Sequence, residues 1–211
     1  MSRKSIKSVI ALAIMVVMGF SLIGCGGNSN TADRTTDTSS ISGEITVITR
    51  EDGSGTRGAF VEIVDITVGG NDNITMEAVV APGTSVMMTN VAENPLAIGY
   101  ASTGVALGDN RVRVLDIDGV FPTVENMLNG TYAIQRPFII GTNVVTGISP
   151  LAQDFVDFIF SAQGQEVVAN RGYVPFIPEG APQYTSSGMS GVIVVNGSSS
   201  LYSLMGHLRD A

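Results

Sequence analysis

One segment of the chain, residues 49–60, concentrates side chains that can bind an anion. It sets two hydroxyl side chains among glycines, and an arginine stands on either side of them. Guanidinium groups offer planar forks of N–H donors that suit tetrahedral oxyanions, and glycine lets a ligand approach the backbone closely. The residues concerned are Arg50, Ser54, Gly55, Thr56 and Arg57. Their types and spacing predict an oxyanion site.

A strand and a helix must hold this segment in place. The β-rich run 44–48 precedes it, and a helical pattern over 58–64 follows it. The first N–H groups of a helix lack internal partners and lie at the positive end of its dipole, so a helix start attracts anions. The simpler alternative is a plain helix cap by Ser54 or Thr56. A nucleotide P-loop is excluded because its lysine is missing.

The first 24 residues read as a secretory signal peptide of a lipoprotein. Arg3, Lys4 and Lys7 precede an apolar stretch over 8–22, which is short for a membrane span. Residues 22–25 resemble a lipobox, which predicts cleavage before Cys25 and lipidation of its thiol. The alternative is an ordinary N-terminal membrane anchor. Residues 25–42 are then a lipid-anchored, flexible tether rich in Gly, Asn, Ser and Thr.

Charge and composition exclude several classes of function. The formal charge of −8 becomes −11 once the three basic residues of the signal peptide are removed, which argues against nucleic-acid partners. Both lysines lie in the signal peptide, Cys25 is the single cysteine, and His207 is the single histidine. The residues needed for lysine chemistry, for Ser-His-Asp or Cys-His catalysis and for histidine-ligated zinc are therefore missing. We expect a binding protein with no enzymatic activity, cofactor or metal.

The remainder of the chain predicts an α/β fold. Short apolar or alternating runs predict strands over residues 45–49, 78–80, 96–100, 111–116, 132–142 and 192–195. Capping residues and helical spacing predict helices over residues 58–64, 86–93 (capped by Ser85), 124–128, 150–160 (capped by Ser149), 163–170 (capped by Ser161) and 201–208. Asp118-Gly119 predicts a hairpin turn.

A second Gly-Ser turn, residues 196–200, repeats the arrangement of the first. It follows the expected strand 192–195 and precedes the expected helix 201–208. Two such turns facing each other would offer backbone and hydroxyl donors to one oxyanion from opposite sides. We therefore expect an anion-binding lobe over 43–146, helices of a second lobe over 147–178, and a linker with a strand-turn-helix of that lobe over 179–211.

With both turns in view, the chain resembles the phosphate-binding lipoproteins of bacterial phosphate ABC transporters, of the clostridial type. The resemblance covers about residues 43–178. The stretches that carry it are residues 45–60, 84–89, 97–100, 136–138, 154–159 with 164–165, and 172–175. It implies a periplasmic-binding-protein type II-like fold, with one lobe near complete and the other partial.

The resemblance also implies roles for individual residues. The positions matching Arg50, Ser54, Gly55 and Thr56 would bind phosphate, and Asp52 would hold the arginine. Ser199 and Ser200 would donate from the other lobe, with Arg57 in a supporting role. Its partners would be phosphate, the ABC permease and the membrane that holds the lipid anchor, on the extracytoplasmic face. We expect a monomer.

Two departures from the family pattern produce alternatives. The Gly-Ser turn at 196–200 follows the Arg50 motif, whereas the usual family order is the reverse, as in a circular permutation. The chain ends about one helix after this turn. The family segment expected next is missing; it carries a serine of the site and the aspartate that would accept a hydrogen bond from the proton of hydrogen phosphate. The alternatives are a truncated or split fragment, or a surface adaptor lipoprotein, with weak or no ligand binding.

Overall fold

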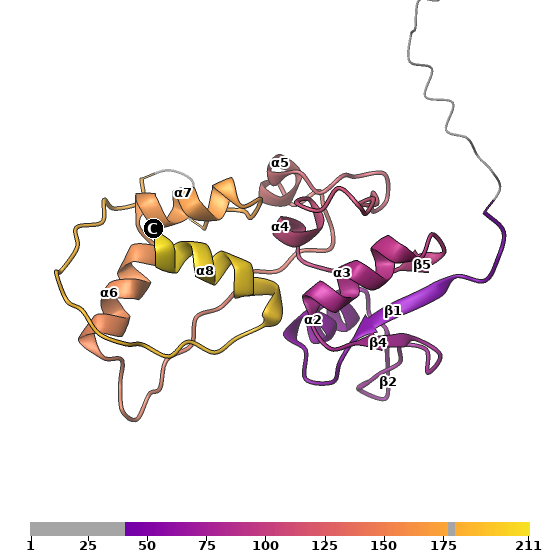
Figure 1. Ribbon diagram of the computed structural model, residues 1–211, viewed down its shortest axis with the longest axis horizontal. Helices are drawn as coiled ribbons and strands as arrows, with labels where there is room; N and C mark the ends of the chain where they lie inside the picture. Colours follow the sequence, from indigo (N-terminus) through magenta and orange to yellow (C-terminus); the bar gives the residue numbers. More distant parts are fainter. Residues whose placement is uncertain (1–40, 177–179) are drawn as a thin grey trace, which may run out of the picture. The chain divides into compact units, whose positions relative to one another are not determined.

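The computed structural model describes residues 41–176 and 180–211 (Figure 1). The expected signal peptide, Cys25 and nearly all of the tether lie outside these residues. Within them, no helix is both long and apolar enough to cross a bilayer.

A three-stranded parallel sheet forms the base of the first half of the chain. The central strand β1 (Thr46–Arg50) pairs with β4 (Val79–Ala81) on one side and β5 (Ala97–Ile98) on the other, giving the order β4-β1-β5. The carboxyl half of β1 is buried. The short apolar runs of the sequence located all three strands, although β4 and β5 lie at the edges of the sheet and Val79, Val80 and Ile98 are 44%, 54% and 43% exposed.

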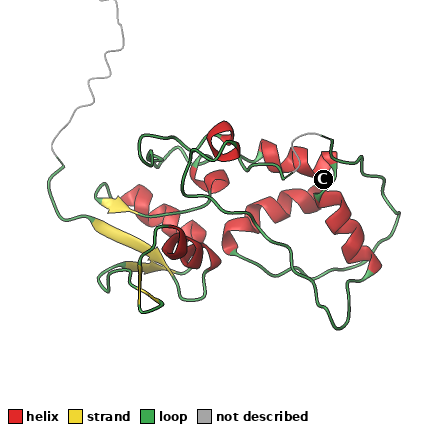
Figure 2. Ribbon diagram, turned by 180° about the vertical axis from the view of Figure 1, so that it is seen from behind, coloured by secondary structure: helices red, strands yellow, loops and turns green. Residues whose placement is uncertain are grey.

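Two helices connect these strands and cover the sheet. The helix α2 (Gly55–Ile63) leads from β1 to β4, and α3 (Thr84–Glu93) leads back across to β5. Because the two right-handed crossovers run in opposite directions, their helices belong on opposite faces, and the front and back views agree with this (Figures 1 and 2). Ile48, Ala81 and Met87 form the buried core between sheet and helix.

Short turns join the smaller elements of this half. β2 (Thr67–Val68) and β3 (Asn71–Asp72) form a small antiparallel hairpin of their own. The expected hairpin turn at Asp118-Gly119 is confirmed: both residues have positive φ, 52° and 77°, and Ile117 bridges Val120. Two short helices, α4 (Thr103–Ala106) and α5 (Val124–Leu128), lie on either side of it in the sequence.

Helices dominate the second half. These are α6 (Pro150–Ile159), α7 (Ala162–Asn170), the 3₁₀ turn η1 (Ser199–Leu201) and α8 (Tyr202–Asp210). The expected caps are confirmed, since the side chains of Ser149 and Ser161 accept N–H bonds from the first turns of α6 and α7. α6 packs on α7 and α7 on α8. Their shared core consists of Phe158, Val168, Tyr173, Leu204 and Leu208.

Three of the strand predictions are wrong. The described residues over 111–116, 132–142 and 192–195 form no ladder, and side chains such as Ile139 (86% exposed) and Val192 (91% exposed) face solvent. β-propensity reports a fit to a pleated, half-buried surface, and these runs find no strand to pair with in the described chain. The α/β class is confirmed, while the division into two lobes stays a prediction.

Two helix starts differ from expectation. α2 begins at Gly55, three residues earlier than expected, because Ser54 caps it. α3 begins at Thr84 with Gly83, not Ser85, in the cap position, since Gly83 has a φ of 123° that a residue with a side chain rarely adopts. In this helix Met87 and Met88 are buried, whereas Val86 is 40% exposed.

Two helical glycines give opposite predictions for stability. A Cβ at Gly164 would lie 2.1 Å from the carbonyl oxygen of Phe158, whereas one at Gly206 meets nothing within 4 Å. Gly164→Ala should therefore lower the free energy of unfolding by about 1–3 kcal/mol. Gly206→Ala should raise it by roughly 0.5–1 kcal/mol, because alanine favours the helix. Chemical denaturation followed by circular dichroism measures both, and equal effects would contradict this packing at α7.

Candidate oxyanion site

Strand register brings three segments together at one edge of the sheet. Arg50 at the end of β1 pairs with Ala81 at the end of β4, so the chain leaves both strands side by side toward the N-termini of α2 and α3. Tyr100, just beyond β5, shares a hydrogen bond with Thr49 (2.7 Å) and accepts the backbone N–H of Arg50 (3.2 Å). The carboxyl ends of parallel strands are the usual ligand edge of such sheets.

Arg50 is the central side chain of this edge, and it is only 2% exposed. Its Nε and Nη2 both donate to the carboxylate of Glu51 at 2.7 Å. Its Nη1 donates to Thr84 Oγ1 at 3.0 Å, and Nη2 also reaches Ser199 Oγ at 2.9 Å. These bonds fix the plane of the guanidinium fork.

Glu51 neutralises this arginine locally. The hydrogen bonds from Arg50 lower the pKa of Glu51 from its ordinary value of 4.5 to about 2, and a further bond from the Gly83 N–H contributes. The carboxylate is therefore ionised throughout the physiological range, so the pair carries no net charge. An anion here must be recognised by directed hydrogen bonds rather than by an excess of positive charge.

The structure brings the two Gly-Ser turns into contact. Ser198 Oγ lies 3.4 Å from Thr56 Oγ1, and Ser199 Oγ lies 3.2 Å from Thr84 Oγ1. Ser200 is buried, and its hydroxyl is bonded to that of Ser198 at 2.9 Å. Hydroxyl groups from three helix starts thus contact one another in pairs, and those of Thr84 and Ser199 also bond the guanidinium group of Arg50.

The first turn caps helix α2 in addition to providing hydroxyl groups to the candidate site. Ser54 Oγ accepts the N–H of Arg57 at 3.4 Å, so the capping alternative describes this side chain correctly. The carbonyl oxygen of Gly55 accepts a bond from Arg136 Nη2 at 2.8 Å. Gly55 therefore lies between the second turn and a further arginine.

The implied role of Asp52 is wrong in this structure. Its side chain is 96% exposed and pairs with Arg57 at 2.8 Å, not with Arg50, which Glu51 holds instead. Arg57 also pairs with Asp72 and donates to the carbonyl oxygen of Arg50 at 2.9 Å. Arg57 thereby supports the backbone of the turn from its outer side.

Three contributors to the site were not expected from the sequence. Thr84 could have been predicted, because it begins the helix that follows β4, and β4 is the parallel neighbour of β1. Glu51 follows Arg50 directly, and the end of the strand lets the two side chains converge. Arg136 offers no local signal, since its contact with Gly55 spans 81 residues.

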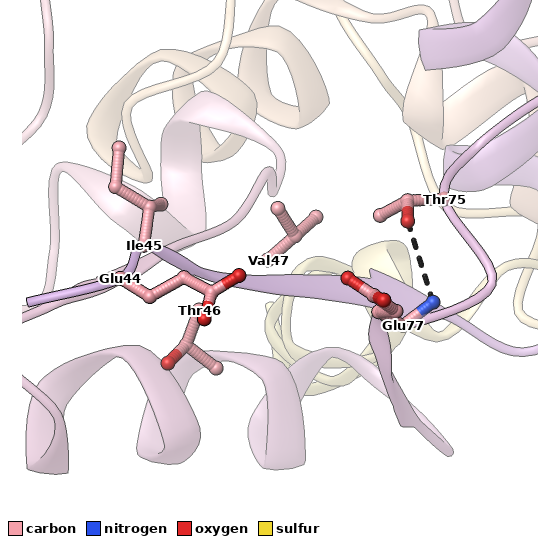
Figure 3. Close-up of a pocket in the computed structure, with 6 residues that line it drawn as sticks. All are labelled: Glu44, Ile45, Thr46, Val47, Thr75 and Glu77. Carbon is pink, nitrogen blue, oxygen red and sulfur yellow. Dashed lines mark hydrogen bonds between the residues drawn. The ribbon is translucent and has the colours of Figure 1, made fainter.

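Two hollows occur near β1, and no residue of the second turn lines either of them. One of about 340 Å³ is lined by residues of the first turn, Ser54 among them, and by the Arg57–Asp72 pair. The other, about 270 Å³, lies along β1, where the carboxylates of Glu44 and Glu77 point toward one another (Figure 3). Two carboxylates repel an anion, so we do not assign the site to this hollow. No group of three potential metal-ligating side chains occurs in residues 41–176 and 180–211.

Comparison with known proteins decides the family. No family model matches the chain. "Phosphate-binding protein PstS 2" of Streptococcus pneumoniae is 40% identical over 211 residues, covering 97% of this chain and 68% of that protein. The chain belongs to the PstS family.

Solved structures agree with this assignment to the PstS family. A phosphate-binding protein of a phosphate ABC transporter from Streptococcus pneumoniae matches with a TM-score of 0.62 and 41% identity, over 80% of this chain and 65% of that one. A putative phosphate ABC transporter substrate-binding protein from Clostridium perfringens, solved with bound phosphate, matches with a TM-score of 0.58 and 35% identity, over 63% and 52%. The expected type II-like fold, present in part, is confirmed.

The order of the two turns is shared with a PstS 2 protein. The match to the pneumococcal relative spans 97% of this chain and so includes both turns in one alignment. The permuted order expected from the sequence is therefore not peculiar to this chain. The chain spans about two thirds of the length of these relatives.

The Arg50–Glu51 pair predicts how stability depends on pH. The folded pKa of Glu51, about 2, lies below its ordinary 4.5. Its contribution is therefore fully present above pH 4.5 and is lost as the pH falls toward 2. Glu51→Gln should destabilise the chain near neutral pH, and the difference from the unaltered chain should shrink on acidification. Denaturation at several pH values measures this, with Glu166→Gln, an exposed carboxylate of α7, as the charge-matched control. A gap that stays constant with pH would contradict the pairing.

Proposed function

We propose that this chain binds inorganic phosphate at the junction of its two turns. Arg50, Ser54, Gly55 and Thr56 donate from the first turn, and Ser199 and Ser200 donate from the second. The observation that carries this is the buried guanidinium of Arg50, held in its plane by Glu51 while its Nη2 reaches Ser199 Oγ on the opposite turn. A fork fixed in this way loses little rotational freedom when it binds an oxyanion.

Local dipoles supply the attraction that net charge does not. Long-range steering repels an anion because the chain without its signal peptide is strongly acidic. The starts of α2 and α3 lie at this junction, where the first N–H groups of a helix have no partner within the helix and the dipole is positive. Oxygens of phosphate would replace the direct Arg50–Ser199 and Thr56–Ser198 contacts, which places one anion between the turns.

The wider role follows from the family. The relatives are phosphate-binding proteins of phosphate ABC transporters, and we infer that this chain delivers phosphate to such a permease without covalent chemistry. Closure of two lobes around the ligand accounts for capture and release. We further infer a monomeric lipoprotein, anchored through acylated Cys25 on the extracytoplasmic face of the cell membrane.

A second candidate is a fragment that binds phosphate weakly or not at all. The observation that favours it is the exposure of β-branched runs that pair with no strand in the described chain, including Val192 (91%) and Val194 (83%). Such runs normally lie in sheets or are covered. Amide exchange over residues 192–195 separates the candidates, because slow exchange in the phosphate-bound chain would contradict an unpaired segment.

Phosphate binding is the direct test. Isothermal titration of residues 25–211 with inorganic phosphate should give a saturable heat. Arg50→Ala should abolish it, because the fork is lost and Glu51 is left without its cation. Arg50→Lys should weaken binding strongly, since an ammonium group cannot span both Thr84 and Ser199. His207→Ala on α8 is the control and should bind as the unaltered chain does. No heat and no thermal shift at millimolar phosphate would overturn the proposal.

A further inference from the structure

A third arginine reaches the junction of the turns from a distant part of the chain. Arg136 Nη2 donates to the carbonyl oxygen of Gly55 at 2.8 Å. An added Cβ at Gly55 would lie 3.5 Å from this nitrogen and 3.9 Å from Oγ of Ser198. The guanidinium group therefore lies beside the first residue of α2 and near the serine that contacts Thr56.

The charges around the junction set Arg136 apart from its neighbours. Arg50 is neutralised by Glu51, and Arg57 faces two carboxylates, Asp52 and Asp72. Among residues 41–176 and 180–211, no carboxylate lies within ion-pair distance of Arg136. Within this region it is the cation that can add net positive charge to the site.

Arg136 lies at a helix start that lacks an acidic side chain. Helix N-termini favour acidic side chains because the dipole is positive there. The first turn of α2 contains no acidic residue, and the guanidinium of Arg136 lies against its first residue. An oxyanion bound at this helix start would supply the missing negative charge and accept hydrogen bonds from the remaining N–H donors of the fork.

We propose that Arg136 is a further phosphate-binding residue of the site, which supplies the positive charge that the neutral Arg50–Glu51 pair does not. This deepens, and rests on, the proposed phosphate-binding function. One N–H anchors the group to the Gly55 carbonyl oxygen, and the others face the anion beside Ser198. Because the Arg136 side chain is exposed, its attraction for the anion is screened by salt.

Arg136→Gln tests this proposal with inorganic phosphate as the probe. Glutamine keeps an N–H donor for the Gly55 carbonyl oxygen and removes the charge. Titration of residues 25–211 should show an affinity about 10- to 100-fold lower, as expected for the loss of a hydrogen bond from a charged group. Arg136→Lys, which keeps the charge, should retain most of the affinity. Arg113→Gln removes the same charge from an exposed arginine outside both turns and should leave binding unchanged.

The salt dependence of the phosphate affinity shows whether the charge of Arg136 interacts with the ligand or whether the side chain only supports the structure of the first turn. Added sodium chloride screens the attraction of Arg136 for the anion, so it should lower the affinity of Arg113→Gln more than that of Arg136→Gln, two variants of equal net charge. Equal affinities and equal salt slopes for these two variants would overturn the inference and leave phosphate binding intact. An unaltered chain that binds no phosphate would overturn the proposed function and the inference together.

Discussion

The burial of one guanidinium group is the constraint on which the candidate site depends. A charged side chain that is 2% exposed persists only where its donors are satisfied and its charge is balanced. Glu51 supplies the balance, and Thr84 and Ser199 supply the remaining partners that the structure shows. The bonds to Thr84 and Ser199 join the end of β1 to the starts of α3 and η1. Structural support and the proposed recognition of an anion therefore share one set of contacts.

Sheet topology explains why these partners meet. Parallel strands end at the same edge, so the segments after β1, β4 and β5 converge there, each with a polar side chain. Arg50 is the last residue of β1, whereas Thr84 comes after β4 and Tyr100 after β5. The second turn approaches this edge from far along the chain. Its Ser198 contacts Thr56 of the first turn, and its Ser199 accepts a hydrogen bond from Arg50.

Features governed by contacts within a few residues were predicted well. The caps at Ser149 and Ser161, the turn at Asp118-Gly119 and the bounds of α5 follow from side-chain and backbone chemistry at short spacing. Strands were predicted less well, because a strand exists only with a partner. Residues 45–49 found partners on both sides, whereas 132–142 and 192–195 found none in the described chain.

The amino-acid sequence alone contains the family motif and the two hydroxyl-rich turns, and it led us to expect a lipid anchor and a protein without lysine or histidine chemistry. Which groups surround Arg50 depends on the tertiary structure. It replaced Asp52 with Glu51 as the partner of that arginine, and it added Thr84 and Arg136. The physical reason is sequence separation. Contacts across 34, 81 and 149 residues depend on strand register and packing, which no local spacing encodes.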